Sequence, residues 1–240
     1  MAPAPRFNCK EQEDLIICAA IKAIEESSLL DFSMSAVAKL SGLSMGSVYK
    51  FVQCKEDVLI ALATRMYQER QRVFKKVLVL PLTTPERIIA TSLLGFNKVQ
   101  MYSFDQELES IVNTKAMMKR CSESWLVQMT SCCLRCKTIF EEFLQAAADS
   151  GELTSGYKDT EEINIGIWSL AAGYFQTVLI HQSRYYDSET KSDINTSALT
   201  TDNVHIKTMK RLINAYDWQQ KISDKDIEKV CEHLKKANLR

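Results

Sequence analysis

Apolar residues in the first third of the chain recur at the spacing of amphipathic helices. The pattern is clearest where apolar side chains stand at i, i+3, i+4 and i+7, at Ile17, Ala20, Ile21 and Ile24. Together with Ser caps and a Gly at the expected turn, such patterns predict four helices, over about residues 11–26, 34–41, 44–51 and 55–76. Because only Gly42-Leu43 separates the second helix from the third, these two helices are expected to cross.

The rest of the chain also has helical periodicity, and no strand-like alternation competes with it. Further helices are predicted over about residues 86–102, 106–114, 122–148, 160–182, 203–216 and 224–237. The intervening segment 183–202 is rich in Ser, Thr and Asp, which predicts a mobile loop. The pattern as a whole predicts an all-α protein.

Composition narrows the class of protein. The 240 residues carry 30 Lys and Arg against 30 Asp and Glu, 46% are hydrophobic, and only 7 are Gly and 4 Pro. These values describe a soluble globular protein and exclude disordered, collagen-like and disulfide-scaffold classes. No apolar signal-peptide core follows the start, and the apolar stretch 163–180 is interrupted by polar residues, so a cytoplasmic protein with mostly reduced thiols is predicted.

Residues 33–55 have the spacing of a helix-turn-helix. Ala38 is small where the second helix crosses closely, and Gly42 can adopt the left-handed conformation that the turn needs. A small apolar core is expected from Val37, Leu43, Val48 and Phe51. The segment holds three lysines and no acid, which gives a local charge of +3 in a chain whose total formal charge is zero.

Several short stretches resemble the N-terminal domain of the TetR family of transcriptional regulators. They are Ile16-Ile17-Cys18-Ala19-Ala20, Val37-Ala38, Gly42-Leu43-Ser44-Met45-Gly46-Ser47-Val48-Tyr49 and Lys55-Glu56. The resemblance implies an N-terminal helix-turn-helix DNA-binding domain over residues 1–54 and a larger C-terminal helical domain over 55–240 that binds an effector and forms a homodimer. It further implies a cytoplasmic, ligand-responsive regulator, most simply a repressor that a small molecule releases from a pseudo-palindromic operator.

Carried over by position, the resemblance implies distinct roles within the DNA-binding segment. Ser44 would cap the recognition helix, Met45, Ser47 and Lys50 would face the major groove, and Tyr49 and Lys55 would hold phosphates. The full set of DNA-binding candidates is Ser33, Ser44, Met45, Ser47, Tyr49, Lys50 and Lys55.

The C-terminal region offers candidates for an effector pocket and for a dimer interface. Aromatic and sulfur side chains that could line a pocket are Met66, Phe96, Met101, Trp125, Met129, Phe140 and Trp168. The apolar surface expected at a dimer interface comprises Ile163, Ile167, Leu170, Ala171, Tyr174, Phe175 and Val178, and the small residues Gly166, Ala172 and Gly173 would allow close approach.

A second hypothesis comes from the cluster Cys132, Cys133 and Cys136, which suits a thiol-redox or metal-responsive helical protein. Cys54 is a further candidate redox residue, because it adjoins the DNA-binding helices at a predicted helix N-terminus. Buried structural cysteine is the competing interpretation, and a helical adaptor that keeps the motif only for packing is a third. The regulator hypothesis needs no catalysis, no cofactor and no metal.

Overall fold

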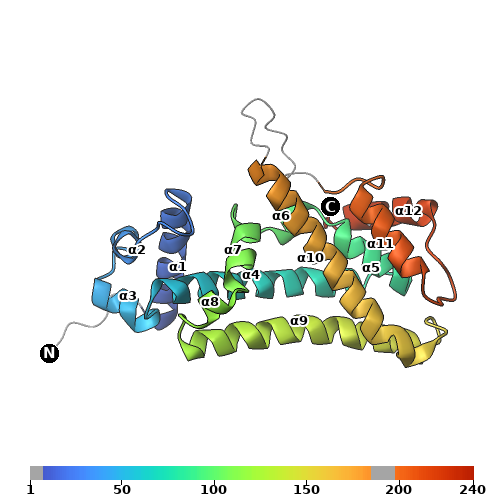
Figure 1. Ribbon diagram of the computed structural model, residues 1–240, viewed down its shortest axis with the longest axis horizontal. Helices are drawn as coiled ribbons and strands as arrows, with labels where there is room; N and C mark the ends of the chain where they lie inside the picture. The colour runs from blue at the N-terminus through green and yellow to red at the C-terminus, as the bar shows by residue number, and fades with distance from the viewer. Residues whose placement is uncertain (1–7, 185–197) are drawn as a thin grey trace. The chain divides into compact units, whose positions relative to one another are not determined.

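The computed structural model describes residues 8–184 and 198–240, and within them every named element is a helix (Figure 1). The first half contains α1 (Cys9–Glu25), α2 (Met34–Ser41), α3 (Met45–Phe51), α4 (Lys55–Leu78), α5 (Thr84–Ser92), α6 (Phe96–Val99), α7 (Asp105–Val112) and α8 (Lys115–Met118). The second half contains α9 (Glu123–Asp149), the 3₁₀-helix η1 (Gly156–Asp159), α10 (Thr160–Arg184), α11 (Val204–Asn214) and α12 (Asp224–Lys236). The prediction of an all-α fold is confirmed.

The chain divides into two compact units. The first comprises Met1–Tyr67 and Tyr102–Cys132, and the second Gln68–Met101 and Cys133–Arg240. The helices α4 and α9 each contribute to both units without a break. The predicted functional domains, 1–54 and 55–240, are a different division of the chain and stay a prediction.

Local signals explain why most helices begin where they do. Asn8, Thr83 and Ser223 each form a capping box, in which the side chain accepts from the third backbone amide of the helix and an acidic side chain accepts from the cap. Pro85 lies in the first turn of α5, where a missing amide hydrogen costs nothing. These caps satisfy donors that a helix cannot satisfy internally.

The helix predicted over residues 86–102 is wrong, because the chain forms α5 and α6 with a break between them. Residues far along the sequence hold the break in place. The amide of Gly95 donates to the carbonyl of Leu239 at 2.9 Å, and the guanidinium of Arg240 donates to the carbonyl of Leu93 at 2.6 Å. Tertiary partners therefore replace the hydrogen bonds that a continuous helix would have made.

The core of the second unit is a single apolar cluster. It is formed by side chains from α4, α5, α9, α10, α11 and α12, with Ile88, Leu144, Ile163, Met209 and Leu234 among its fully buried members. Within the described residues, no helix has the length and hydrophobicity to span a membrane. Most of the predicted loop 183–202 lies outside the described residues.

Candidate nucleic-acid interface

The helices α2 and α3 form a helix-turn-helix in the first unit. Gly42 ends α2 with φ 67° and ψ 17°, the left-handed conformation that the sequence predicted at this turn. Ser44 then caps α3, because its hydroxyl accepts from the amide of Ser47 at 3.1 Å. Val37 on α2 and Val48 on α3 are completely buried, and α2 packs against both α1 and α3 (Figure 1).

One face of α3 is turned to solvent. Met45 is 39% exposed and Tyr49 44% exposed, Lys50 is exposed, and Ser47 is half-buried. None of these side chains contributes to the apolar core, since Val48 alone of the α3 residues is buried. The structure thus brings the predicted base-contacting residues and Tyr49 onto one short helix.

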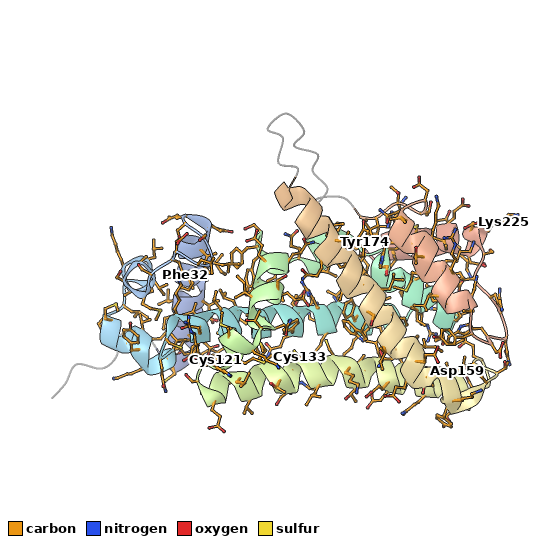
Figure 2. The ribbon with its side chains drawn as sticks, viewed as in Figure 1. Phe32, Cys121, Cys133, Asp159, Tyr174 and Lys225 are labelled. Atoms are coloured by element: carbon orange, nitrogen blue, oxygen red, sulfur yellow. The ribbon has the colours of Figure 1, made fainter. Side chains whose placement is uncertain are left out.

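The remaining two DNA-binding candidates also have structural roles. Ser33 is exposed, and its hydroxyl caps α2 by accepting from the amide of Ala36 at 3.1 Å. Lys55 donates to the carbonyl of Leu30 and stands 4.5 Å from the centroid of the Phe32 ring, which Figure 2 labels. An ammonium group has three donors, so Lys55 keeps others for a phosphate.

The start of α4 is joined to the segment before α9 by a buried carboxylate. Asp57 is fully buried and accepts from the amide of Gln53 at 2.9 Å, from the amide of Ser122 at 2.7 Å, and from the Ser122 hydroxyl. Burial by itself raises the pKa of Asp57, but these hydrogen bonds outweigh it and lower the pKa. The carboxylate is therefore ionised at neutral pH and fixes two chain segments relative to each other.

Trp125, predicted as a pocket residue, contacts the end of α3. Its indole nitrogen donates to the carbonyl of Phe51 at 3.3 Å, and its ring meets the Phe51 ring edge-on with centroids 5.2 Å apart. The other pocket candidates are divided between the two units. Met66 and Met129 are buried in the first unit, whereas the second holds buried Phe140, half-buried Phe96, exposed Met101 and 37% exposed Trp168.

In the second unit, three aromatic rings form an edge-to-face cluster. Phe140 lies 5.6 Å from Phe74 and 5.4 Å from Trp168, measured between ring centroids, and Phe74 and Trp168 are 6.5 Å apart. Two of the predicted pocket residues are therefore neighbours. Such clusters present a large apolar surface of defined geometry.

A second aromatic group in the same unit surrounds a buried histidine. His205 is 2% exposed and stacks on Tyr174, which Figure 2 labels on α10, at a centroid distance of 4.6 Å. Its Nε2 lies 3.2 Å from the Ser92 hydroxyl, while its Nδ1 has no hydrogen-bond partner among the described residues. Burial lowers the pKa of His205 to about 4, so the ring is neutral at physiological pH.

The predicted dimer residues on α10 separate into two groups. Ile163 and Ile167 are buried in the core of their own unit, and Gly166 faces the side chain of Leu212 on α11. Both isoleucines are therefore covered by their own chain. The other candidates, Leu170, Ala171, Tyr174, Phe175 and Val178, are half-buried. The exposed face of α10 includes Ile165, Trp168, Ala172 and Gly173.

The cysteines named in the thiol and metal hypothesis differ in burial and in their contacts. Cys132 and Cys136 are buried, and the described part of the chain contains no group of three or more His, Cys, Asp or Glu that could hold a metal ion. The thiol of Cys54 donates to the carbonyl of Arg120 at 3.5 Å. Burial, together with Asp57, raises the pKa of Cys54 to about 11, which opposes the expected reactive thiolate.

Sequence reasoning missed Asp57 and Ser122, whose contact joins positions 65 residues apart. The only local signal was that each stands at the start of a predicted helix, where Asp and Ser are common. Nothing in the spacing indicated that the two would meet.

Known proteins resemble this chain in fold and only weakly in sequence. No family model matches the sequence, and no curated protein is significantly similar to it. Among solved structures, the transcriptional regulator FadR from Bacillus subtilis, in complex with stearoyl-CoA, matches 84% of this chain and 95% of its own with a TM-score of 0.52 and 18% identity. A tetR-family regulatory protein from Rhodococcus RHA1 matches 89% of this chain and 100% of its own with a TM-score of 0.53 and 16% identity. The chain therefore has the fold of the TetR-family transcriptional regulators.

Proposed function

We propose that this protein is a DNA-binding transcriptional regulator that holds a pseudo-palindromic operator as a homodimer in the cytoplasm and is released from it by a small molecule. The observation that carries the proposal is the helix-turn-helix itself. Gly42 supplies the left-handed turn, Ser44 caps α3, and Val48 anchors it, while Met45, Tyr49 and Lys50 are left exposed. A helix that is anchored on one side and exposed on the other fits the major groove.

The exposed side chains divide by chemistry. Met45, Ser47 and Lys50 can meet base edges, and Tyr49 and Lys55 can hold phosphates. Phosphate contacts give affinity and register, and base contacts give sequence preference. Loss of Tyr49 is therefore expected to weaken binding to all duplexes, whereas loss of Lys50 is expected to change which sequence is preferred.

Dimerisation is assigned to the outer face of α10. Ile165 is 56% exposed and Trp168 37% exposed, and Ala172 and Gly173 beside them are small enough to allow another helix to approach. A two-fold dimer presents two copies of α3, so the operator half-sites are expected about 34 to 36 Å apart, one turn of DNA.

Effector binding is assigned to the second unit, and the ligand-free protein is assigned the role of a repressor. The fold neighbour FadR was crystallised with stearoyl-CoA, which supports a ligand-binding role for a helical region of this kind. Such a ligand would lower operator affinity if it bound best to a conformation of the dimer in which the two copies of α3 no longer match the spacing of the operator half-sites. A coupling free energy of about 1 to 3 kcal/mol between ligand binding and DNA binding corresponds to a change in operator affinity of about 5- to 150-fold.

The test is selection of binding sites from a random duplex pool at about 150 mM salt, because charge-driven binding depends steeply on salt. Wild-type protein is compared with the double variant Tyr49→Ala, Lys50→Ala. The matched control is Tyr157→Ala, Lys158→Ala, which removes the same exposed Tyr-Lys pair from η1 in the second unit.

Enrichment of a two-fold symmetric sequence by the wild type and the control, but not by the α3 variant, is the expected result. If folded wild-type protein enriches nothing, or if the α3 variant enriches the same site, α3 does not read DNA and the proposal fails.

A further inference from the structure

The recognition helix is too short to hold its own conformation. The helix α3 has seven residues, Met45–Phe51, and isolated helices of fewer than about 12 residues are marginal in water. Its N-terminus is satisfied by Ser44. At its C-terminus the chain leaves the helix at Val52, with φ −128° and ψ 129°, so the carbonyl of Phe51 needs a partner from outside the helix.

Trp125 is that partner. It lies in the first turn of α9, and its indole N–H donates to the Phe51 carbonyl at 3.3 Å. The two rings also meet edge-on, at an interplanar angle of 73°. The contact joins the recognition helix to a residue 74 positions later in the sequence, and both lie in the first compact unit.

The position of Trp125 is itself fixed. Ser122, three residues earlier, donates its amide and its hydroxyl to the buried carboxylate of Asp57. The carbonyl of Arg120 accepts from the thiol of Cys54, and the Arg120 guanidinium lies 3.6 Å from the carboxylate of Glu56. The start of α9 is thus held to the start of α4, and Figure 2 labels Cys121 in this same segment. A donor held in this way can orient the helix that accepts from it.

We propose that Trp125 is a positioning residue that sets the orientation of α3 for base reading. The proposal rests on the proposed function, since it requires that α3 reads DNA. Trp125 touches no DNA in this assignment and acts only through Phe51. Trp125 lies in the first turn of α9, and both Trp125 and Phe51 belong to the first compact unit. A change in α9 would reach α3 through one hydrogen bond and one ring contact.

The test is Trp125→Phe, which keeps an aromatic ring and removes the donor. Affinity for the selected operator is expected to fall about 5-fold, the effect of one hydrogen bond worth about 1 kcal/mol. Affinity for a scrambled duplex and the dependence of binding on salt concentration are expected to stay unchanged, because phosphate contacts are intact. Amide exchange at residues 48–52 is expected to become faster.

The matched control is Trp218→Phe in the second unit. Trp218 also donates its indole N–H to a carbonyl near the end of a helix, that of Ile213 in α11, at 2.9 Å. The control therefore loses the same kind of hydrogen bond. It is expected to lower the thermal unfolding midpoint without changing the operator preference or the amide exchange of α3.

Two results overturn the proposal. The first is an equal loss of affinity for operator and scrambled duplex after Trp125→Phe, which would mean that the variant damages the whole DNA-binding head. The second is unchanged amide exchange at residues 48–52. If wild-type protein binds no duplex at all, the proposed function fails, and the exchange measurement still decides whether Trp125 holds α3.

Discussion

Removal of the Asp57 carboxylate is expected to destabilise the first unit strongly. The side chain accepts three hydrogen bonds in a fully buried position, from the amides of Gln53 and Ser122 and from the Ser122 hydroxyl. A hydrogen bond to a charged group contributes about 1.5 to 3 kcal/mol, and two of the three donors belong to one residue and so are not independent. The Asp57→Ala variant is therefore expected to lose about 3 to 5 kcal/mol of unfolding free energy. A typical domain has about 5 to 15 kcal/mol in total.

The assay is urea denaturation followed by circular dichroism at a fixed protein concentration, because dimerisation would make the midpoint concentration-dependent. Asp57→Asn retains an oxygen acceptor and is expected to lose about half as much. The matched control is Asp226→Ala at the start of α12, where a partly exposed carboxylate accepts from the amide and the hydroxyl of Ser223 at 2.8 and 2.6 Å. A helix cap of this kind is worth about 1 kcal/mol.

The reasoning is refuted if Asp57→Ala costs no more than Asp226→Ala. The pH dependence gives an independent check. Since the folded-state pKa of Asp57 lies below its ordinary value, its contribution is fully present above the ordinary carboxyl pKa and is lost as the pH falls from there through the lowered pKa. In the wild type the contribution must therefore remain intact at about pH 5, above the ordinary carboxyl pKa.

Three further predictions concern single sites. Gly42→Ala is expected to lower the stability of the protein by about 1 to 2 kcal/mol in thermal unfolding, because it forces a side chain into the left-handed region. Gly46→Ala, inside α3, is expected to leave the stability unchanged or to raise it, and the opposite order of the two variants would contradict the turn geometry. The pKa of His205 is 6.5 in the unfolded chain and about 4 in the folded protein, so the unfolded state takes up a proton first as the pH falls. Acidification from about pH 7 to about pH 5 is therefore expected to lower the free energy of unfolding by about 2 kcal/mol. His205→Gln should flatten that part of the stability profile, and an unchanged profile would exclude His205 as its source. Ile165→Glu on α10 is expected to raise the monomer fraction measured by sedimentation equilibrium. The control Val127→Glu, at a similarly exposed apolar position on α9, is expected to leave the monomer fraction unchanged. Equal effects of the two variants would show that the dimer interface is not on α10.

Features that depend on neighbouring residues could be predicted from the sequence. The Ser44 cap, the left-handed Gly42 and the bounds of α2 follow from residues within one turn of each other. Long amphipathic helices such as α9 and α12 were also predicted to within about two residues. Local rules were enough for these because the energies that decide them are local.

Features that depend on distant residues could not be predicted. The break between α5 and α6 is held by Leu239 and Arg240, and Asp57 meets Ser122 across 65 positions. The periodicity of α10 indicated an apolar surface correctly, but Ile163 and Ile167 on it face their own core. A hydrophobic pattern indicates that one face of a helix is buried, but it does not indicate whether that face packs against the same chain or against a second one.

The division of roles within α3 has an evolutionary consequence. Val48 and Phe51 hold the helix in place, and Ser44 caps it, whereas Met45 and Lys50 are exposed and lie outside the apolar core. Substitutions at such exposed positions usually change stability by less than about 0.5 kcal/mol. On the proposed function, a lineage carrying this scaffold could therefore acquire a new operator by one or two changes in α3 without first gaining stability to spare.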